Sequence, residues 1–247
     1  MKIEEVRVDT DALGTFSGEI ERTGTHLETA FRKARLGLEA TGLPYAIASE
    51  GSVGADPQLI FINANIETMV FIDEILGIQI HETYKSNDIV AFTTTTQEDN
   101  LQEFLLKADF PNHKVIVKPK DGPGAIKGIG TLSDLQKAVR KARTISSDGE
   151  AIIESDLRAM SSPSRQRNIS IAASKLAKRL SQICPECLTP GWGVKGFLKG
   201  VECSECGELS EKALRQEELG CIKCEFRALG AVINLSLDPS ECMGCNP

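Results

Sequence analysis

The sequence contains no run of about 18 apolar residues, the length that a membrane-spanning helix requires. Its first residues, MKIEEVRVD, lack the basic and then apolar pattern of a secretory signal peptide. Both absences lead us to expect a cytoplasmic protein without a membrane partner, and disulfide bonds are rare in that compartment. The 8 cysteines are therefore expected to bind metal rather than to form disulfides.

The cysteines occur as four C-x-x-C pairs near the C-terminal end of the sequence. One such pair presents two thiolates to one metal ion, and a tetrahedral four-thiolate zinc site requires two pairs. The pattern therefore predicts two structural Zn²⁺ ions in a double zinc ribbon over residues 182–247. Spacing does not fix the pairing: we favour sequential pairing (first with second, third with fourth), and nested pairing (second with third, first with fourth) is the alternative. The predicted ligands are Cys184, Cys187, Cys203, Cys206, Cys221, Cys224, Cys242 and Cys245.

The predicted zinc ribbon has few large apolar side chains, so metal must supply much of its folding free energy, about 10–16 kcal/mol per site in zinc peptides. Closed four-thiolate sites leave no open position for a substrate, which favours a structural role. Residues 184–247 carry six positive and ten negative side chains, and acidic surfaces repel phosphate backbones. We therefore expect this ribbon to contact a protein partner rather than nucleic acid.

Residues 1–181 alternate helical and strand patterns, which predicts a mixed α/β domain with a central sheet and flanking helices. One helix should begin after Thr25, which forms a T-x-x-E capping box with Glu28, and should end at Gly42. Glu50 should lie in a polar loop after a short strand. Strands are expected at residues 45–48, 66–73, 77–84, 115–117 and 151–154, and further helices at residues 133–144 and 163–180.

Part of this domain resembles the pyrophosphatases of inosine and xanthosine triphosphate, in the Maf-like superfamily. That superfamily carries the motifs E-T-x-x-T, E-N-A-x-x-K-A, T-G and A-D-D-S-G in this order. The corresponding stretches here are Glu21 to Thr25, Glu28 to Ala34, Thr41-Gly42 and Ala48 to Ser52, with Thr29 in place of Asn and Ser49-Glu50 in place of the Asp pair. The chain also resembles an uncharacterised bacterial family with a cysteine-rich tail and the run D-T-D-x-x-G-T-F-x-G-E-I-x-R, residues 9–22 here.

The pyrophosphatase resemblance implies a Mg²⁺-dependent enzyme that acts on non-canonical nucleoside triphosphates. Glu28 and Glu50 would hold the Mg²⁺, with Asp9 or Asp11 as further ligands, and Lys33 would stabilise the phosphates. The superfamily opens with a T-x-N-x-x-K loop that binds the triphosphate, and this sequence lacks it. We therefore expect either a truncated N-terminus or a degraded site.

Basic residues gather between positions 137 and 179, which hold ten positive and four negative side chains. Ser162-Pro163 predicts the start of a helix there, and free N–H groups at a helix N-terminus bind phosphate together with guanidinium groups. The pyrophosphatase superfamily has an S-H-R motif at a comparable place, where this chain has Ser164-Arg165. The alternatives are a solvated basic helix and a nucleic-acid surface. The predicted phosphate ligands are Arg158, Arg165 and Arg167.

The stretch from Val115 to Glu154 also resembles part of an ATP-grasp nucleotide site, with a strand ending in V-x-V-K-P, a Gly-rich loop, a helix and a strand ending in Glu. This resemblance implies that Lys118 and Glu154 contact a nucleotide. ATP-grasp enzymes need Mg²⁺-binding carboxylates further downstream, where this chain enters the cysteine pairs instead. Three functions remain open: a nucleotide hydrolase or nucleotide-binding protein, a non-catalytic scaffold that docks a protein partner through the ribbon, and a nucleic-acid-binding protein.

Overall fold

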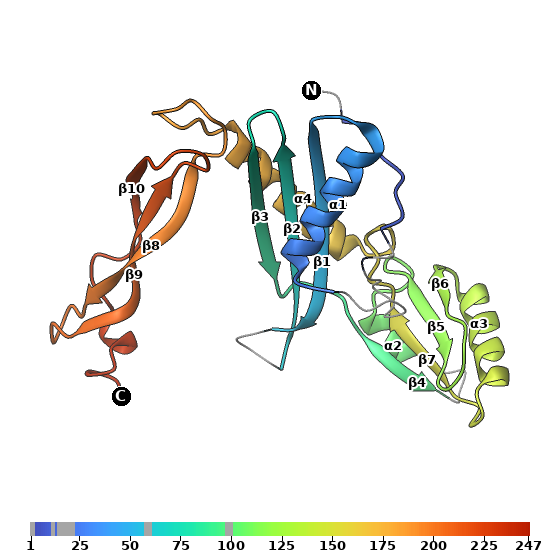
Figure 1. The fold of residues 1–247 in the computed structure, drawn as a ribbon. Helices are drawn as coiled ribbons and strands as arrows, with labels where there is room; N and C mark the ends of the chain where they lie inside the picture. Colours follow the sequence, from blue (N-terminus) through green and yellow to red (C-terminus); the bar gives the residue numbers. More distant parts are fainter. Residues whose placement is uncertain (1–2, 11–12, 14–22, 57–60, 97–100) are drawn as a thin grey trace. The chain divides into compact units, whose positions relative to one another are not determined.

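The computed structural model describes residues 3–10, 13, 23–56, 61–96 and 101–247 (Figure 1). These residues form four α-helices and three small sheets, which confirms the predicted mixed α/β class. The chain divides into two compact units: unit 1 comprises Met1–Phe71 and His81–Ser174, and unit 2 comprises Ile72–Ile80 and Lys175–Pro247. Asp11 and most of the run at residues 9–22 lie outside the described residues. Of the helices described, none has the length and apolar character needed to cross a membrane.

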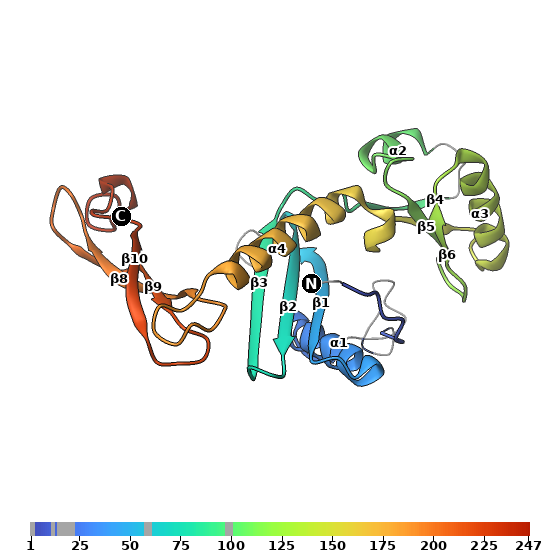
Figure 2. The ribbon, with the colours of Figure 1, turned by 90° about the horizontal axis from the view of Figure 1, so that it is seen from above.

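The first sheet has the strand order β1-β2-β3 and is covered by one helix on each face. Figures 1 and 2 show α1 on one face and the first half of α4 on the other. The elements are α1 (His26–Thr41), β1 (Tyr45–Ala55), β2 (Asn63–Asp73), β3 (Ile78–Ser86) and α4 (Pro163–Ser181).

Helix α1 begins and ends as the sequence predicts. The Thr25 hydroxyl accepts the Glu28 backbone N–H, the Glu28 carboxylate accepts the Thr25 backbone N–H, and Gly42 closes the helix at φ 64°. Its apolar side, with Ala30, Ala34 and Leu38, is buried. Local side-chain chemistry therefore fixes this helix before any packing is considered.

Strand β1 is longer than predicted, and the polar loop expected after residue 48 is wrong. The strand continues through Glu50 and Gly51 to Ala55, beside β2. Gly51 leaves room for side chains from neighbouring elements, since a Cβ at this position would lie 2.5 Å from Glu67 Oε2. A Gly/Ser-rich run that reads as a loop is in this case a strand with close neighbours.

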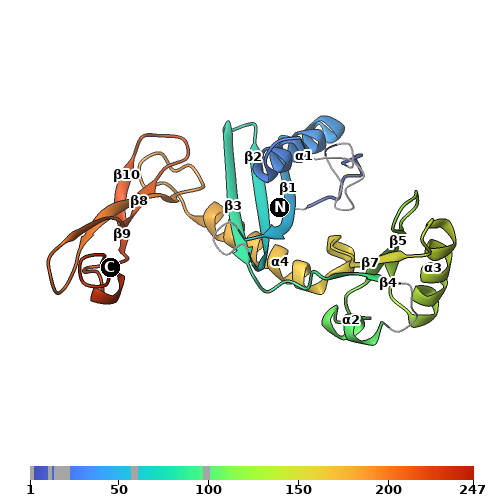
Figure 3. The same ribbon diagram turned by 90° about the horizontal axis from the view of Figure 1, so that it is seen from below.

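The second sheet has the order β4-β7-β5-β6, and each neighbouring pair is antiparallel (Figure 3). Helices α2 and α3 pack on the same face, where Val115, Val117 and Ile153 form a core with Leu135 and Phe104. Successive residues of a strand point to opposite faces, so Ile116, Lys118 and Glu154 point away from these helices. The elements are β4 (Thr93–Thr96), α2 (Gln102–Lys107), β5 (Val115–Pro119), β6 (Ile126–Ile129), α3 (Leu132–Ile145) and β7 (Ala151–Ser155).

Unit 2 contains the tip of the β2–β3 hairpin, the end of α4 and the cysteine-rich ribbon. The ribbon is an antiparallel sheet of order β10-β9-β8, with the elements β8 (Gly193–Glu202), β9 (Leu209–Gly220) and β10 (Arg227–Val232). The buried cluster of the ribbon is small: Val201, Leu237 and two cysteines, with Ala213 packed against them. Such a core is too small to stabilise sixty residues alone, in agreement with the expected dependence on metal.

Candidate functional site

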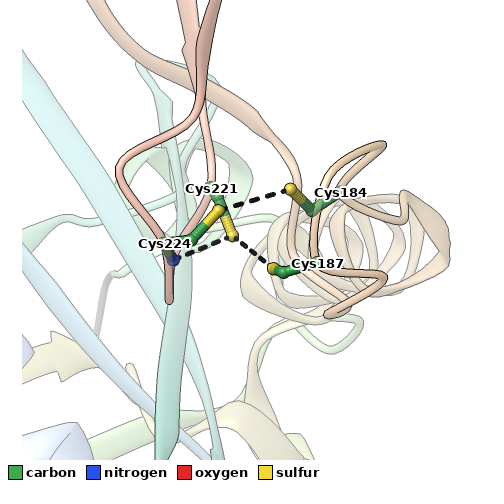
Figure 4. Close-up of side chains that lie close together, drawn as sticks. All are labelled: Cys184, Cys187, Cys221 and Cys224. Atoms are coloured by element: carbon green, nitrogen blue, oxygen red, sulfur yellow. Dashed lines mark hydrogen bonds between the residues drawn. The ribbon is translucent and has the colours of Figure 1, made fainter.

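The eight cysteines form two clusters, each able to hold a metal ion. Site 1 consists of Cys184, Cys187, Cys221 and Cys224, and site 2 of Cys203, Cys206, Cys242 and Cys245. Figure 4 shows the four side chains of site 1 converging from two separate turns. The ligand atoms within each site lie within 4.8 Å of one another.

The sulfur spacing in both sites suits a tetrahedral metal rather than disulfides. Sγ–Sγ distances across the paired knuckles are 3.7 and 3.5 Å in site 1 and 3.8 and 3.6 Å in site 2. A disulfide requires about 2.05 Å, whereas four thiolates at about 2.3 Å from zinc are about 3.8 Å apart. The clusters therefore have the geometry of closed four-thiolate sites.

The pairing of the knuckles is interleaved, so both the sequential and the nested pairings were wrong. The first knuckle precedes β8 and the third follows β9. Since Gly193 pairs with Gly220, these two knuckles meet at one end of the sheet. The second knuckle lies in the β8–β9 turn, where Glu202 pairs with Leu209, and β10 carries the fourth knuckle back toward that end. Strand direction, which spacing does not reveal, decides the pairing.

Each knuckle is a tight turn closed by backbone hydrogen bonds. In the first, the Cys184 N–H donates to the Thr189 carbonyl at 2.9 Å, and Leu188 adopts φ 59°. The second has the same turn, with Gly207 at φ 73° in the position of Leu188. In the third, the N–H groups of Lys223 and Cys224 lie 3.3 Å from Cys221 Sγ. Each turn thus directs the two sulfurs of a knuckle toward one place, as a shared metal ion requires.

In each site the pKa of one thiol is lowered and the pKa of at least one other is raised. The Thr189 hydroxyl and backbone N–H lower the pKa of the Cys187 thiol to about 6. Backbone N–H groups of Cys206 and Glu205 lower the pKa of Cys203 to about 7. The neighbouring thiols of Cys206 and Cys203 raise the pKa of Cys245 to about 12. Four thiolates so close together need a cation to neutralise them, and a bound dication supplies that charge.

The predicted Mg²⁺ and phosphate residues near α1 lie in two separate places. Glu28 is exposed and accepts the Thr25 N–H at 2.8 Å; this N–H, then the Thr25 hydroxyl, holds the pKa of Glu28 below its ordinary value. Glu50 is buried on β1 and forms an ion pair with Lys33 at 2.5 Å. Lys33 and Glu50 are thus brought together, while Glu28 serves the helix cap.

Arg165 lies on the other face of the first sheet. Its Nε and Nη2 donate to the two oxygens of Glu67 at 2.6 and 3.0 Å, and both side chains are buried. Gly51 approaches this pair, and successive strand residues face opposite sides, so Glu50 and Arg165 are separated by the sheet. Arg167 is exposed, 3.6 Å from Asp88. The predicted pyrophosphatase residues are therefore not gathered into one pocket.

Of the other two predicted phosphate residues, Arg158 lines a pocket on the open face of the second sheet, and Lys118 pairs with Glu154 of the lining. Lys118 Nζ lies 2.9 Å from Glu154 Oε2, and Arg158 donates to both oxygens of buried Asp156 at 2.9 and 2.6 Å. Gly128 of β6, in the stretch that the sequence predicts as a Gly-rich loop, donates its N–H to Asp156 at 3.0 Å. The cavity, of about 220 Å³, is lined by Ala91, Phe92, Thr93, Ile116, Glu154, Ser155, Asp156, Leu157 and Arg158.

An Asp–His–Ser chain at the start of α4 was not foreseen from the sequence. His113 Nδ1 lies 2.8 Å from Asp109 Oδ2, and Nε2 lies 3.0 Å from Ser164 Oγ. The Ser164 backbone N–H also donates to Nε2, at 3.1 Å, so the imidazole caps the helix. Ser164 and His113 are both buried, and their contacts are those of a helix cap. The i, i+4 spacing of Asp109 and His113 was the available signal.

The comparisons with known proteins give a family but no activity. No curated protein and no solved structure matches the chain. The resemblances to pyrophosphatases and to ATP-grasp proteins thus stay predictions. A family model described as a domain of unknown function, DUF6671, matches residues 33–247, which include both cysteine sites and the pocket. Because this match covers most of its length, the chain belongs to the DUF6671 family.

Proposed function

We propose that the ribbon binds two Zn²⁺ ions and that both are structural. The observation that carries this proposal is the convergence of four cysteines at each site, with sulfur separations of 3.5–3.8 Å. Four thiolates in a tetrahedral arrangement favour zinc over the other common divalent ions of the cell. Because all four ligands come from the protein, no position is left for a substrate. The metal then supplies the folding free energy that the small ribbon core lacks.

Metal analysis of the purified chain tests this proposal. We expect two Zn²⁺ per chain, one after Cys187→Ser or Cys206→Ser, and none after both substitutions. Both thiols are exposed members of their sites, so the two variants are matched. A strong chelator should unfold the ribbon in the wild type. A chain that holds no zinc with all eight thiols reduced would contradict the proposal.

We propose further that the pocket on the second sheet binds a nucleotide. Support comes from the apolar side chains of Phe92 and Ile116 and the cation of Arg158, which line the cavity. Two lining carboxylates add to it, since Glu154 pairs with Lys118 and Asp156 accepts the Gly128 N–H. Apolar walls with a few charged groups are typical of small-ligand sites. A bound phosphate would compete with Glu154 and Asp156 for the two cations.

Calorimetric titration with ATP, ITP and XTP, each with Mg²⁺, tests the pocket. Lys118→Ala should weaken binding by roughly tenfold or more, because a charge-assisted hydrogen bond is lost. Lys120→Ala is the matched control, since Lys120 pairs with Asp148 at 2.9 Å, outside the cavity, whereas Lys118 pairs with Glu154 of the cavity lining. If no nucleotide binds, or if both variants lose affinity equally, the pocket is not the site.

Hydrolysis is a separate question, and the pyrophosphatase activity remains a prediction. Incubation with ITP, XTP and the standard triphosphates in Mg²⁺ measures pyrophosphate release against a Glu50→Ala control. The separation of Glu50 from Arg165 by the first sheet leads us to expect no release above that control.

The scaffold function with a protein partner agrees with the closed metal sites. A salt-dependent shift of DNA or RNA would instead support the basic segment at residues 137–179.

A further inference from the structure

The two metal sites differ in what their knuckles contact. Site 1 borders the tip of the β2–β3 hairpin, Ile72–Ile80, which belongs to the same compact unit as the ribbon. Two isoleucines of this tip, Ile78 and Ile80, are only 2% and 3% exposed. A hairpin tip that ended in solvent would leave such side chains accessible, so other residues of the fold cover them.

The residues that cover Ile80 belong to the knuckles of site 1. At Gly191, just after the first knuckle, a Cβ would lie 2.5 Å from Ile80 Cδ1 and 3.4 Å from Ile222 Cγ2. Ile222 stands between Cys221 and Cys224 in the third knuckle. Gly191 also has φ +98°, so glycine is required both by the backbone and by the approach of Ile80. One turn from each half of site 1 therefore forms the surface on which the hairpin tip packs.

The end of α4 fixes the first of these turns. Arg179 Nε donates to the Gly191 carbonyl at 2.7 Å, and Nη1 donates to the Val194 carbonyl at 2.8 Å. The N–H groups of Gly191 and Trp192 donate to the Gln182 carbonyl at 2.9 and 3.1 Å. The third knuckle, with Ile222, is joined to this arrangement through the cysteines that would share the metal.

Site 2 has different surroundings. The buried residues that pack with its cysteines Cys203 and Cys242 are Val201 and Leu237, with Ala213 beside them. All of these residues come from the ribbon itself, and the cluster contains no residue of the hairpin tip. Loss of metal here would affect the ribbon around the β8–β9 turn.

We propose that the metal at site 1 controls the order of the hairpin tip, and that the metal at site 2 does not. The proposal rests on the proposed zinc binding. Metal bonds hold the Gly191 and Ile222 turns together, and without them the surface under Ile80 separates into two mobile turns. Coupling of this kind is reciprocal, so packing of the hairpin tip must also strengthen metal binding at site 1. Metal binding at site 1 would thereby change the order of the tip of β2 and β3, although none of the eight cysteines lies in these strands.

Hydrogen exchange of the zinc-loaded chain, measured by mass spectrometry, tests the forward effect. In Cys187→Ser, amides of residues 72–80 should exchange roughly tenfold faster or more than in the wild type. In Cys206→Ser, the matched site 2 variant, exchange in this segment should stay within about twofold. Equal acceleration in both variants, or none in Cys187→Ser with site 1 shown empty by metal analysis, would overturn the proposal.

Zinc release to a chromogenic chelator tests the reverse effect while all eight ligands remain in place. Ile80→Ala should speed the release of one of the two ions several-fold and leave the other unchanged. Ile80→Val gives a smaller change in the same direction and covers the case in which alanine unfolds the chain. The control is Ile75→Ala in the same tip, where the side chain is 68% exposed. Unchanged release of both ions in the two Ile80 variants refutes the inference alone, whereas a chain without zinc refutes the proposed metal binding itself.

Discussion

Charged residues on the first sheet are buried in pairs between two helices, whereas those on the second sheet point away from α2 and α3. Glu67 pairs with Arg165 and Glu50 with Lys33, and the carboxylates of both pairs are buried. On the second sheet, Lys118 and Glu154 form a pair that is accessible to solvent. Buried pairs leave no room for a ligand, while an accessible pair can exchange one partner for a phosphate. We therefore expect the charged pairs of the first sheet to maintain stability, and the accessible pair of the second sheet supports the proposed binding site there.

The largest effect should follow the loss of Arg165. Arg165→Ala leaves the buried Glu67 carboxylate without its bidentate partner, and breaking a buried pair from one side costs about 3–5 kcal/mol. Urea unfolding measures this change. Arg167→Ala is the control, because Arg167 is 59% exposed and such a substitution changes stability by about 0.5 kcal/mol or less. If Arg165→Ala instead weakened nucleotide binding and left stability unchanged, the comparison would fail at its main point.

A smaller effect is expected at Lys33. Lys33→Met keeps the length of the side chain and removes the charge beside buried Glu50, which should cost about 1–3 kcal/mol. Adding Glu50→Gln should recover part of this loss, since the carboxylate that needs the charge is then absent. The double-mutant cycle, again by urea unfolding, gives the coupling free energy of the pair. A coupling near zero would show that Lys33 and Glu50 act independently and would reopen a catalytic role for them.

Local features of this fold could be predicted from the sequence, and distant pairings could not. The cap of α1 needs only Thr25 and Glu28, three residues apart, and was correct. The partner of Arg165 is Glu67, 98 residues earlier, and no periodicity or motif links them. The place of Arg165 at the start of a helix, after Ser164, therefore predicts a phosphate ligand, although its guanidinium is bound by Glu67.

For the metal sites too, the local turns could be predicted from the sequence and the pairing of distant turns could not. The identity of the ligands follows from the C-x-x-C repeat, because each pair is a local turn. The directions of β8, β9 and β10 decide which pairs share a metal. The spacing of the C-x-x-C pairs does not predict the register in which Gly193 pairs with Gly220. For Glu50, the glycine and serine residues around it predict a loop, although the segment is a strand in which Gly51 is approached by the side chains of Glu67 and Arg165.

An intermediate case lies at the edge of the second sheet, where Arg158 contacts a buried carboxylate from a half-buried position. Burial alone would raise the pKa of Asp156, but the Arg158 guanidinium and backbone N–H hold it below its ordinary value. A depressed carboxyl pKa stabilises the fold above the ordinary value of about 3.9 and loses this contribution as pH falls through the folded-state pKa. Arg158→Ala should therefore cost about 1 kcal/mol at neutral pH and less below pH about 3. Urea midpoints measured at both pH values check this, and a cost that is independent of pH would remove Asp156 from the explanation.

The smallest stability change should come from substitution of Glu154. This variant tests most directly whether the accessible pair differs from the buried pairs of the first sheet. Glu154→Gln removes one charge of an accessible pair, which is worth about 0–1 kcal/mol, so the urea midpoint should hardly move. Without its carboxylate partner, Lys118 should attract a triphosphate more strongly. If Glu154 only neutralises the lysine, the nucleotide affinity of the variant should be unchanged or higher than that of the wild type. If affinity falls while stability holds, Glu154 contacts the ligand itself. If Glu154→Gln instead lowered the free energy of unfolding by several kcal/mol, this pair would maintain the fold, as Glu67 and Arg165 do. That result would contradict the proposed nucleotide site on the second sheet.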